Sequence, residues 1–446
     1  MIWLVDMTSY EKSIDPQLEA YKKDYFRMKS YARYQKIGPT APVKTRVYGT
    51  GLLRLATLLH RNGCPVRYLD RQLLEKALEA GEDLPRLVAF SCVCPTIPAA
   101  AELCTRIKGM SASTEVVLGG IHVNVATEQT RQKFPEFDRL IVGFELEAAQ
   151  QLTTKPLQDL PGGYVDHSLL PYPIHEYAIN TFSTMGCPFR CRYCVDSVAP
   201  YFCASDTGQL EELMRHLPEG NLVHFFDSVL GHSQQRLRQV CAAIKATGHR
   251  FKLSCDMRAD LMTPELAKVM EDAGFVEIRL GMESADDSLL EQNERTLSFA
   301  KFREKLAMIR ENSHFYIALY TVVGLPGTTW QSQEKTWQAC HELLTQGLVD
   351  EIKSAMYVPY PMAHLDYSQQ GVTVCNEDWS QYDRQSYPVY HTRELTREEL
   401  WQIYLETSRR INESWLEALG FERIDDVPQI QGYYSEYVAQ NYLQNS

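Results

Sequence analysis

The chain has 446 residues, enough for two or three ordinary domains with separate cores. Hydrophobic residues make up 44% and charged residues 23%, as in soluble globular proteins. The formal net charge of −12 argues against a broad nucleic-acid surface, so we expect a small-molecule or peptide substrate. No apolar run is long enough to span a membrane, and Met1–Asp6 lacks the basic start of a secretory signal. The twelve cysteines do not resemble a disulfide framework, so we expect a reduced, cytoplasmic setting.

Residues 1–152 alternate between strand-like and helix-like segments. The pattern predicts strands at 2–6, 66–70, 87–93, 115–118 and 139–142. It predicts helices at 50–62, 72–80, 97–108, 127–134 and 145–152. Five strands in this alternation indicate an α/β domain with a doubly wound, flavodoxin-like parallel sheet. Ligands of such sheets bind beyond the carboxyl ends of the strands. The segments expected there are Asp6–Tyr10, Ser91–Thr96, Gly119–Asn124 and the stretch from Gly143.

An insert at residues 15–44 interrupts this alternation after the first strand. It is rich in Lys, Arg and Tyr, and Tyr21–Tyr34 has the composition of a helix with a basic face. We expect a solvated helix here, because a charged stripe usually faces water. The alternative is a lid, since long inserts at a strand's carboxyl end are often functional.

A proline-rich linker at residues 153–178 separates this half from a second run of strands and helices. Strands are expected at 180–185, 222–226, 251–255, 276–282, 315–323 and 352–358, with helices such as 234–247 and 263–273 between them. Residues 179–378 therefore predict a partial six-stranded (β/α) barrel. In the C-terminal region, residues 379–446, Thr396 and Glu399 form a capping box for a helix that runs to Leu419. The Tyr/Gln-rich end, 432–446, either covers the barrel or frays.

Three cysteines lie in one short loop at the end of the first barrel strand: Cys187, Cys191 and Cys194. Thiolates at this density select zinc or an iron–sulfur cluster. A structural zinc site wants four protein ligands, and no fourth Cys or His lies at a suitable spacing. A 4Fe–4S cluster held by three thiolates keeps one iron open for a ligand. The alternative is a chance group of buried structural cysteines.

This loop resembles the cluster-binding signature of the radical S-adenosylmethionine (SAM) enzymes, in which an aromatic residue such as Tyr193 precedes the last cysteine. Motifs at the ends of the following strands resemble the family as well. The resemblance implies that SAM is bound by Tyr193, Asp227, Ser228, Arg258, Glu283, Ser284, Gly324 and Leu325. After Leu290 the family commonly has Asn-Lys, whereas this chain has Asn293-Glu-Arg295, so we assign no role to that segment.

The N-terminal half resembles the cobalamin-binding domain that precedes the barrel in one large group of these enzymes. The resemblance implies that the corrinoid tail is lined by Ser91, Thr96, Gly119, Gly120, His122 and Gly143. Two departures from the family pattern stand against it. The Asp-x-His-x-x-Gly element that supplies a cobalt ligand is absent, and Gly143-Phe-Glu-Leu-Glu147 replaces Gly-Glu-Gly-Glu. A degenerate domain that no longer binds cobalamin is the alternative.

The resemblance implies a 4Fe–4S cluster, SAM and cobalamin as cofactors, with an external electron donor such as flavodoxin or ferredoxin. It favours cobalamin-dependent methylation of a small molecule or natural product, started by a 5′-deoxyadenosyl radical. The runner-up is a cobalamin-independent radical reaction such as dehydration, epimerisation, rearrangement or decarboxylation. RNA modification of the methylthiotransferase type and a corrinoid sensor with a relic barrel are further alternatives. We expect neither a nucleic-acid nor a membrane partner.

Overall fold

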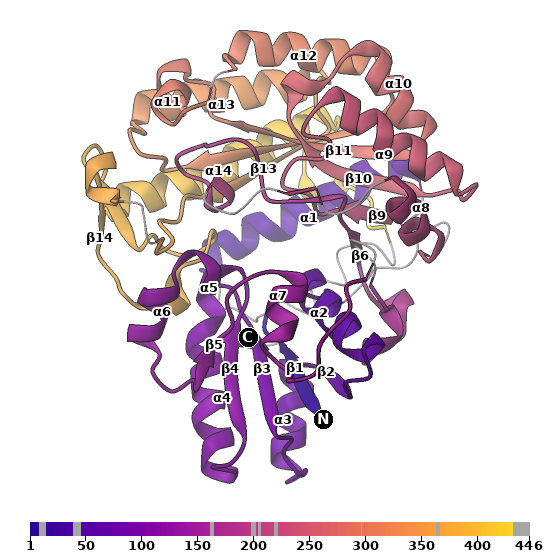
Figure 1. Cartoon of the computed structure of the whole chain (residues 1–446). Coiled ribbons are helices and arrows are strands. Elements are labelled where there is room, and N and C mark those ends of the chain that lie inside the picture. The colour runs from indigo at the N-terminus through magenta and orange to yellow at the C-terminus, as the bar shows by residue number, and fades with distance from the viewer. Residues whose placement is uncertain are drawn as a thin grey trace.

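The computed structural model describes residues 1–8, 15–38, 46–160, 165–197, 202–203, 207–217, 222–295, 297–362 and 366–430. Two parallel sheets organise these residues, one in the N-terminal half and one in the barrel, and they are stacked end to end (Figure 1). The Tyr/Gln-rich end, 432–446, lies outside the described residues. Within the described ranges, no helix combines the length and the apolarity needed to cross a membrane.

The first sheet has the strand order β2-β1-β3-β4-β5, all parallel, which confirms the flavodoxin-like prediction. Its strands are β1 (Ile2–Asp6), β2 (Val66–Asp70), β3 (Leu87–Ser91), β4 (Glu115–Gly119) and β5 (Arg139–Leu140). Its helices are α2 (Thr50–Arg61), α3 (Arg71–Glu79), α4 (Ile97–Met110), α5 (Ile121–Val125), α6 (Thr127–Lys133) and α7 (Glu145–Gln150). Alternate strand residues pack against α2 and α7 on one face and against α3 and α4 on the other. Both faces are therefore buried, which explains the continuous apolar strands.

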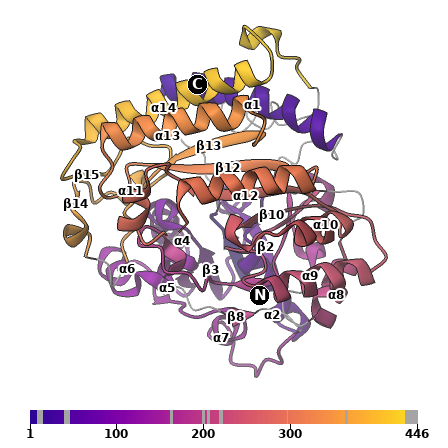
Figure 2. The ribbon, with the colours of Figure 1, turned by 90° about the horizontal axis from the view of Figure 1, so that it is seen from above.

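The second sheet has the order β13-β12-β11-β10-β9-β6, again parallel, as a partial barrel requires. Its strands are β6 (Ile179–Thr181), β9 (Leu222–Phe225), β10 (Lys252–Met257), β11 (Phe275–Glu283), β12 (Tyr316–Val323) and β13 (Glu351–Met356). Figure 2 shows the helices around its outside. They are α8 (Thr207–Arg215), α9 (Gln234–Ala246), α10 (Pro264–Asp272), α11 (Asp287–Gln292), α12 (Phe299–Asn312) and α13 (Trp330–Thr345).

The strand expected at 180–185 is broken. β6 ends at Thr181, and β7 (Thr184–Met185) leaves the barrel to pair antiparallel with β8 (Phe202–Cys203). The break has a visible cause, since the Ser183 N–H donates to the Asp227 carboxylate at 2.9 Å instead of to a neighbouring strand. The cysteine loop therefore starts from a short hairpin.

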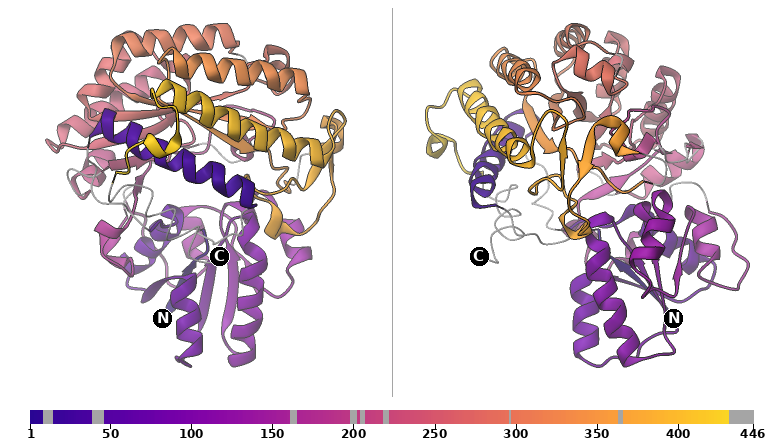
Figure 3. Two further views of the ribbon diagram at one scale, coloured as in Figure 1. Left: turned by 180° about the vertical axis from the view of Figure 1, so that it is seen from behind. Right: turned by 90° about the vertical axis from the view of Figure 1, so that its left-hand side faces the viewer.

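Helix α1 (Pro16–Ile37) contradicts the prediction of a solvated helix. It lies beside α14 (Arg397–Ala418) against the barrel, as Figure 3 shows. Lys29 and Arg33 on its basic face are buried and form ion pairs with Glu351 and Glu277, each at 2.6 Å. The basic stripe was read as facing water because its partners lie some 240 to 320 residues further along the chain.

The C-terminal region joins the two halves. Its short strands β14 (Val372–Val374) and β15 (Tyr390–Thr392) pair antiparallel, and α14 begins at the capping box expected at Thr396 and Glu399. Trp379 packs on the first domain, with its ring 4.7 Å from the ring of His122. This region therefore contributes to a core that also contains α3, α4 and the end of β12.

Candidate active site

The three loop cysteines lie close to one another. Cys187 is buried, Cys191 and Cys194 are half-buried, and the Cys194 N–H donates to the Cys191 carbonyl at 3.1 Å. Each thiol influences the others electrostatically, and burial raises the pKa of Cys194 to about 12. Among the residues described, no three His, Cys, Asp or Glu side chains form a group that could hold a single metal ion. Three thiols in one loop are the ligand set of a 4Fe–4S cluster with one open iron.

Asp227 holds the start of this loop. Its carboxylate accepts hydrogen bonds from the Ser183 N–H, the Ser183 hydroxyl and the Thr184 hydroxyl, at 2.9, 2.7 and 2.5 Å. Burial raises the pKa of Asp227, although these donors act against it. Three donors already bind the Asp227 carboxylate. Asp227 therefore positions the start of the cysteine loop, and its predicted contact with the SAM amino group stays a prediction. Ser228, the next residue, is half-buried.

Arg258 lies over the cysteine loop. Its guanidinium stacks on the Phe189 ring at 3.9 Å and forms a double hydrogen bond with Asp260, at 3.0 and 2.7 Å. Arg258 also influences the Cys187 thiol electrostatically. Its position beside the loop fits the predicted contact with a SAM carboxylate.

Glu283, at the end of β11, is at the centre of the site. It accepts a hydrogen bond from the Tyr193 hydroxyl, and the Arg295 guanidinium lies 3.9 Å away. Burial raises the pKa of Glu283, while Arg295 and Tyr193 lower it. Its backbone has a φ of 64°, which is strained for a residue with a side chain and is typical of functional positions.

Arg295 was assigned no role from the sequence, yet it connects the site. It donates to the Gly281 carbonyl at 2.7 Å and to the Cys191 sulfur, and it faces Glu283. The neighbouring Arg192–Glu294 ion pair, at 2.9 Å, also joins this segment to the cysteine loop. The available signal was the charge, since a cation follows Asn293 here as in the family, only one residue later.

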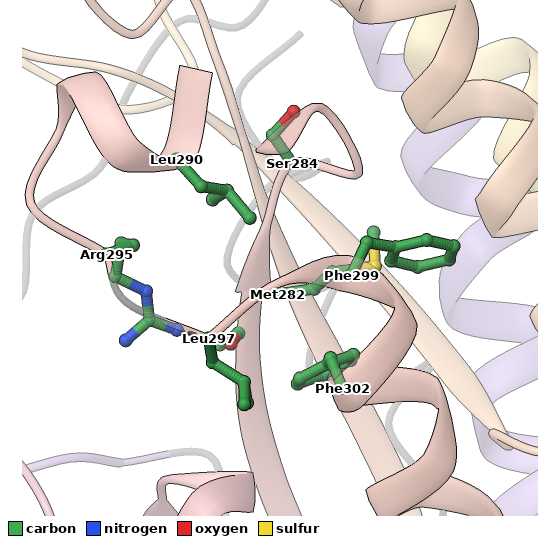
Figure 4. Close-up of a pocket in the computed structure, with 8 residues that line it drawn as sticks. Met282, Ser284, Leu290, Arg295, Leu297, Phe299 and Phe302 are labelled. Atoms are coloured by element: carbon green, nitrogen blue, oxygen red, sulfur yellow. Dashed lines mark hydrogen bonds between the residues drawn. The ribbon is translucent and has the colours of Figure 1, made fainter. Parts of the chain in front are cut away.

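Three other predicted SAM residues lie in packed surroundings. The Ser284 hydroxyl hydrogen-bonds with Thr336 on α13 at 3.0 Å. Ser284 also lines a small pocket beside β11, together with Met282, Leu290 and Phe302 (Figure 4). Gly324 accepts a hydrogen bond from the Tyr390 hydroxyl at 2.8 Å, and Leu325 is fully buried. The roles of these residues in SAM binding stay predictions.

Gly120, at the edge of the first sheet, is required by the backbone itself. Its φ is 113°, and a Cβ atom there would collide with the Cys92 carbonyl oxygen and lie 2.8 Å from the Cys92 nitrogen. Gly119 differs, because its Cβ would make only ordinary contacts, 3.4 Å from Ile141 and 3.9 Å from the Phe90 carbonyl oxygen. The glycine at 120 therefore lets the loops after β3 and β4 approach each other, whether or not a ligand is bound.

The remaining predicted corrinoid residues also engage their own domain. The Thr96 hydroxyl exchanges hydrogen bonds with Val93, and the side-chain amide of Asn124 bonds both backbone groups of Gly143. His122 is buried against Trp379, and burial lowers its pKa to about 4. Among the residues that the structure describes, its Nε2 has no hydrogen-bond partner. Ser91 is half-buried at the end of β3. Their contacts to a corrinoid stay predictions.

The two candidate sites face each other. Val195, next to the last cysteine, packs against an apolar cluster of Val125, Ala126 and Met362, and the first two of these follow the Gly119–Asn124 segment. Near the cysteine loop, Arg384 hydrogen-bonds with Tyr360 and influences Cys194 electrostatically.

The facing edges also leave large apolar side chains exposed. Ile121 and Val142 follow β4 and β5 and are each 38% exposed, and Phe226 follows β9 and is 66% exposed. Uncovered apolar side chains at a sheet's ligand edge fit a large, flat cofactor, because such surfaces usually mark a binding site.

Family models match the two halves of the chain separately. A model of the B12 binding domain matches residues 38–153, and a model of the Radical SAM superfamily matches residues 181–339. The chain therefore combines a B12-binding domain with a radical SAM domain.

Particular relatives carry different activities. An anaerobic magnesium-protoporphyrin IX monomethyl ester cyclase from Cereibacter sphaeroides is 24% identical over 75% of this chain and 61% of its own length. An uncharacterized methyltransferase from Pyrococcus horikoshii is 21% identical over 66% of this chain and 72% of its own. Among solved structures, the radical SAM methyltransferase TsrM from Kitasatospora setae covers 90% of this chain and 88% of its own, at a TM-score of 0.57 and 16% identity. This last likeness shows a shared fold.

Proposed function

We propose that this enzyme methylates an unactivated carbon of a small molecule in a cobalamin-dependent radical reaction. The observation that carries the proposal is the packing of Val195, beside the last cluster cysteine, against the small apolar cluster of Val125, Ala126 and Met362, two members of which lie at the ligand edge of the first domain. A corrinoid at that edge and SAM at the cluster would share one space, as methyl transfer to a substrate radical requires. The methyltransferases among its relatives support the same function.

The residues divide the work in this proposal. Cys187, Cys191 and Cys194 hold a 4Fe–4S cluster with one open iron. Arg258 and Glu283 orient SAM at that iron, while Arg295 holds Glu283 and Cys191 in register. In this family, reduced cluster and SAM supply a 5′-deoxyadenosyl radical, and methylcobalamin supplies the methyl group. An external donor such as flavodoxin or ferredoxin, and the cytoplasm as compartment, stay predictions.

A second candidate is a radical ring closure or rearrangement without methyl transfer. The cyclase from Cereibacter sphaeroides favours it, because that protein matches 75% of this chain. The structure of the first domain is compatible with this second candidate. His122 is buried, and Gly120 and Gly143 contact neighbouring segments of the same domain, so none of the three needs a bound corrinoid to explain its position.

Product analysis separates the two candidates. The anaerobically reconstituted enzyme is first dialysed against hydroxocobalamin, and bound corrinoid is measured by absorbance. Turnover with deuterated-methyl SAM is then followed by mass spectrometry. Methyl transfer should give 5′-deoxyadenosine and S-adenosylhomocysteine in equal amounts, because two SAM molecules are used per turnover. Formation of 5′-deoxyadenosine alone, with or without bound corrinoid, would favour the second candidate. No corrinoid binding would end the methyltransferase proposal.

A further inference from the structure

The inner wall of the barrel carries charged side chains that have no role in the proposed cluster, SAM or corrinoid sites. Along β11, the outward residues Ile278, Leu280 and Met282 are buried under the helices, whereas Arg279 and Glu283 are half-buried and face the interior. The strand register shows which residues of the neighbouring strands lie level with these inward-facing residues. Gly281 pairs with Tyr320 on β12, and Tyr320 pairs with Lys353 on β13. Lys353 therefore lies on the inner wall, about one step below Glu283.

Most charges on this wall are neutralised by neighbours. Glu277 binds Arg33 at 2.6 Å and Arg279 at 2.7 Å, and Glu351 binds Lys29 at 2.6 Å. These pairs close the lower part of the barrel with side chains from α1.

Lys353 is different. Within the described part of the chain it forms no ion pair and no hydrogen bond, and its one contact of note is the Tyr320 ring, with the ammonium 6.0 Å from the centroid. The charged groups that act on it are Lys29, Glu351, Arg279 and Arg384, and three of these four are cations. Burial and these cations lower the pKa of Lys353 to about 8.

Lys353 is half-buried, and a cation that loses part of its hydration without gaining a counter-ion destabilises the fold. Such a group persists where a ligand supplies the missing charge, and perturbed groups of this kind gather at functional sites. We propose that Lys353, which lies beside Tyr320 on the inner wall of the barrel, binds a carboxylate of the substrate. That the occupant is the substrate rests on the proposed function. The substrate class is thus a carboxylic acid whose reacting carbon lies between this anchor and the cluster.

The binding test uses acetate as the probe and the full chain with its reconstituted cluster. Lysines are dimethylated with ¹³C-formaldehyde and observed by NMR. The Lys353 signal is identified by its absence in Lys353→Arg, because arginine is not labelled. In chloride-matched buffers, acetate should raise the pKa of this signal saturably, by roughly one unit for a tenfold preference for the charged amine. Exposed Lys301 in the same sample is the control and should not respond.

Two outcomes would overturn the proposal. One is a Lys353 signal that moves no more than that of Lys301 at any acetate concentration. The other is loss of the acetate effect when SAM is added, since the anchored carboxylate would then belong to SAM itself.

A stability measurement distinguishes ligand binding from a structural role. Lys353→Met should leave the urea midpoint unchanged or raised, because no partner loses its counter-ion. A clear fall in the midpoint would make Lys353 a structural residue instead. Neither measurement uses cobalamin or SAM cleavage, so failure here leaves the proposed function intact, and failed methyl transfer leaves this site intact.

Discussion

The carboxyl edges of the two sheets use their motif residues in opposite ways. At the barrel edge, side chains from distant segments meet, as Tyr193, Glu283 and Arg295 do beside the cysteine loop. At the edge of the first sheet, Gly120 and Gly143 are engaged with their own backbone and neighbouring loops. The comparison teaches that motif residues at equivalent strand ends can have different roles. In the barrel the side-chain chemistry matters, whereas in the first sheet the close approach of the chain matters.

The cysteine loop should give the largest effect. Changing Cys187, Cys191 or Cys194 to Ala removes one of only three thiolate ligands. We expect loss of the cluster and of all SAM cleavage, measured by iron content, the visible spectrum and 5′-deoxyadenosine formation. Cys375→Ala is the control, because that thiol is exposed and lies outside the loop. Full activity in any of the three variants would refute the assignment of the cluster.

The first sheet should respond through stability. Gly120→Ala places a Cβ against Cys92 at a φ of 113°, which should lower the free energy of unfolding by roughly 2 to 5 kcal/mol. Gly119→Ala is a matched control one residue away, where the Cβ meets only an ordinary contact. Urea unfolding of the two variants without cofactors measures the difference. Equal stability would mean that Gly120 is not needed by the backbone, and its role would return to the ligand.

The SAM site should respond through affinity. Glu283→Gln and Arg258→Ala each remove a charge beside the cluster loop, and loss of a charged hydrogen bond costs about 1.5–3 kcal/mol. SAM binding should therefore weaken roughly tenfold to a hundredfold, with the iron content unchanged. Glu294→Gln is the control, since its ion pair with Arg192 is half exposed to solvent. Unchanged affinity in both test variants would show that SAM binds elsewhere.

Both sheets could be predicted because each strand is a short apolar run that is visible in the local sequence. Five of the six barrel strands lie close to the expected ranges. The sequence also predicted that Tyr193, Arg258 and Glu283 share one site, since strand ends in a parallel barrel meet at one edge. It failed where partners are distant. The pairing of Arg33 with Glu277 and of Arg295 with Cys191 depends on tertiary contacts that no local pattern contains.

The local sequence also does not show which motif residues become buried. His122 follows two glycines at a sheet edge, which suggests a residue facing a ligand. Trp379 covers it instead, from a segment more than 250 residues further along the chain. Because of this contact, His122 tests whether motif side chains of the first sheet are packed within the protein or face a ligand as in the barrel.

His122 should make stability depend on pH. Burial lowers its pKa to about 4, below the ordinary value of 6.5, so between these values the unfolded chain binds a proton that the folded chain does not. Stability contributed by the neutral ring is then present above pH 6.5 and is lost as the pH falls toward 4. Relative to His122→Asn, the wild type should lose about 2 kcal/mol more between pH 7 and pH 5. His60→Asn changes an exposed histidine and should keep the wild-type dependence. If the His122→Asn protein instead shows the wild-type slope in urea unfolding, the ring titrates normally in the folded state. His122 would then lie open at the ligand edge, and the first sheet would present side chains to its ligand as the barrel does.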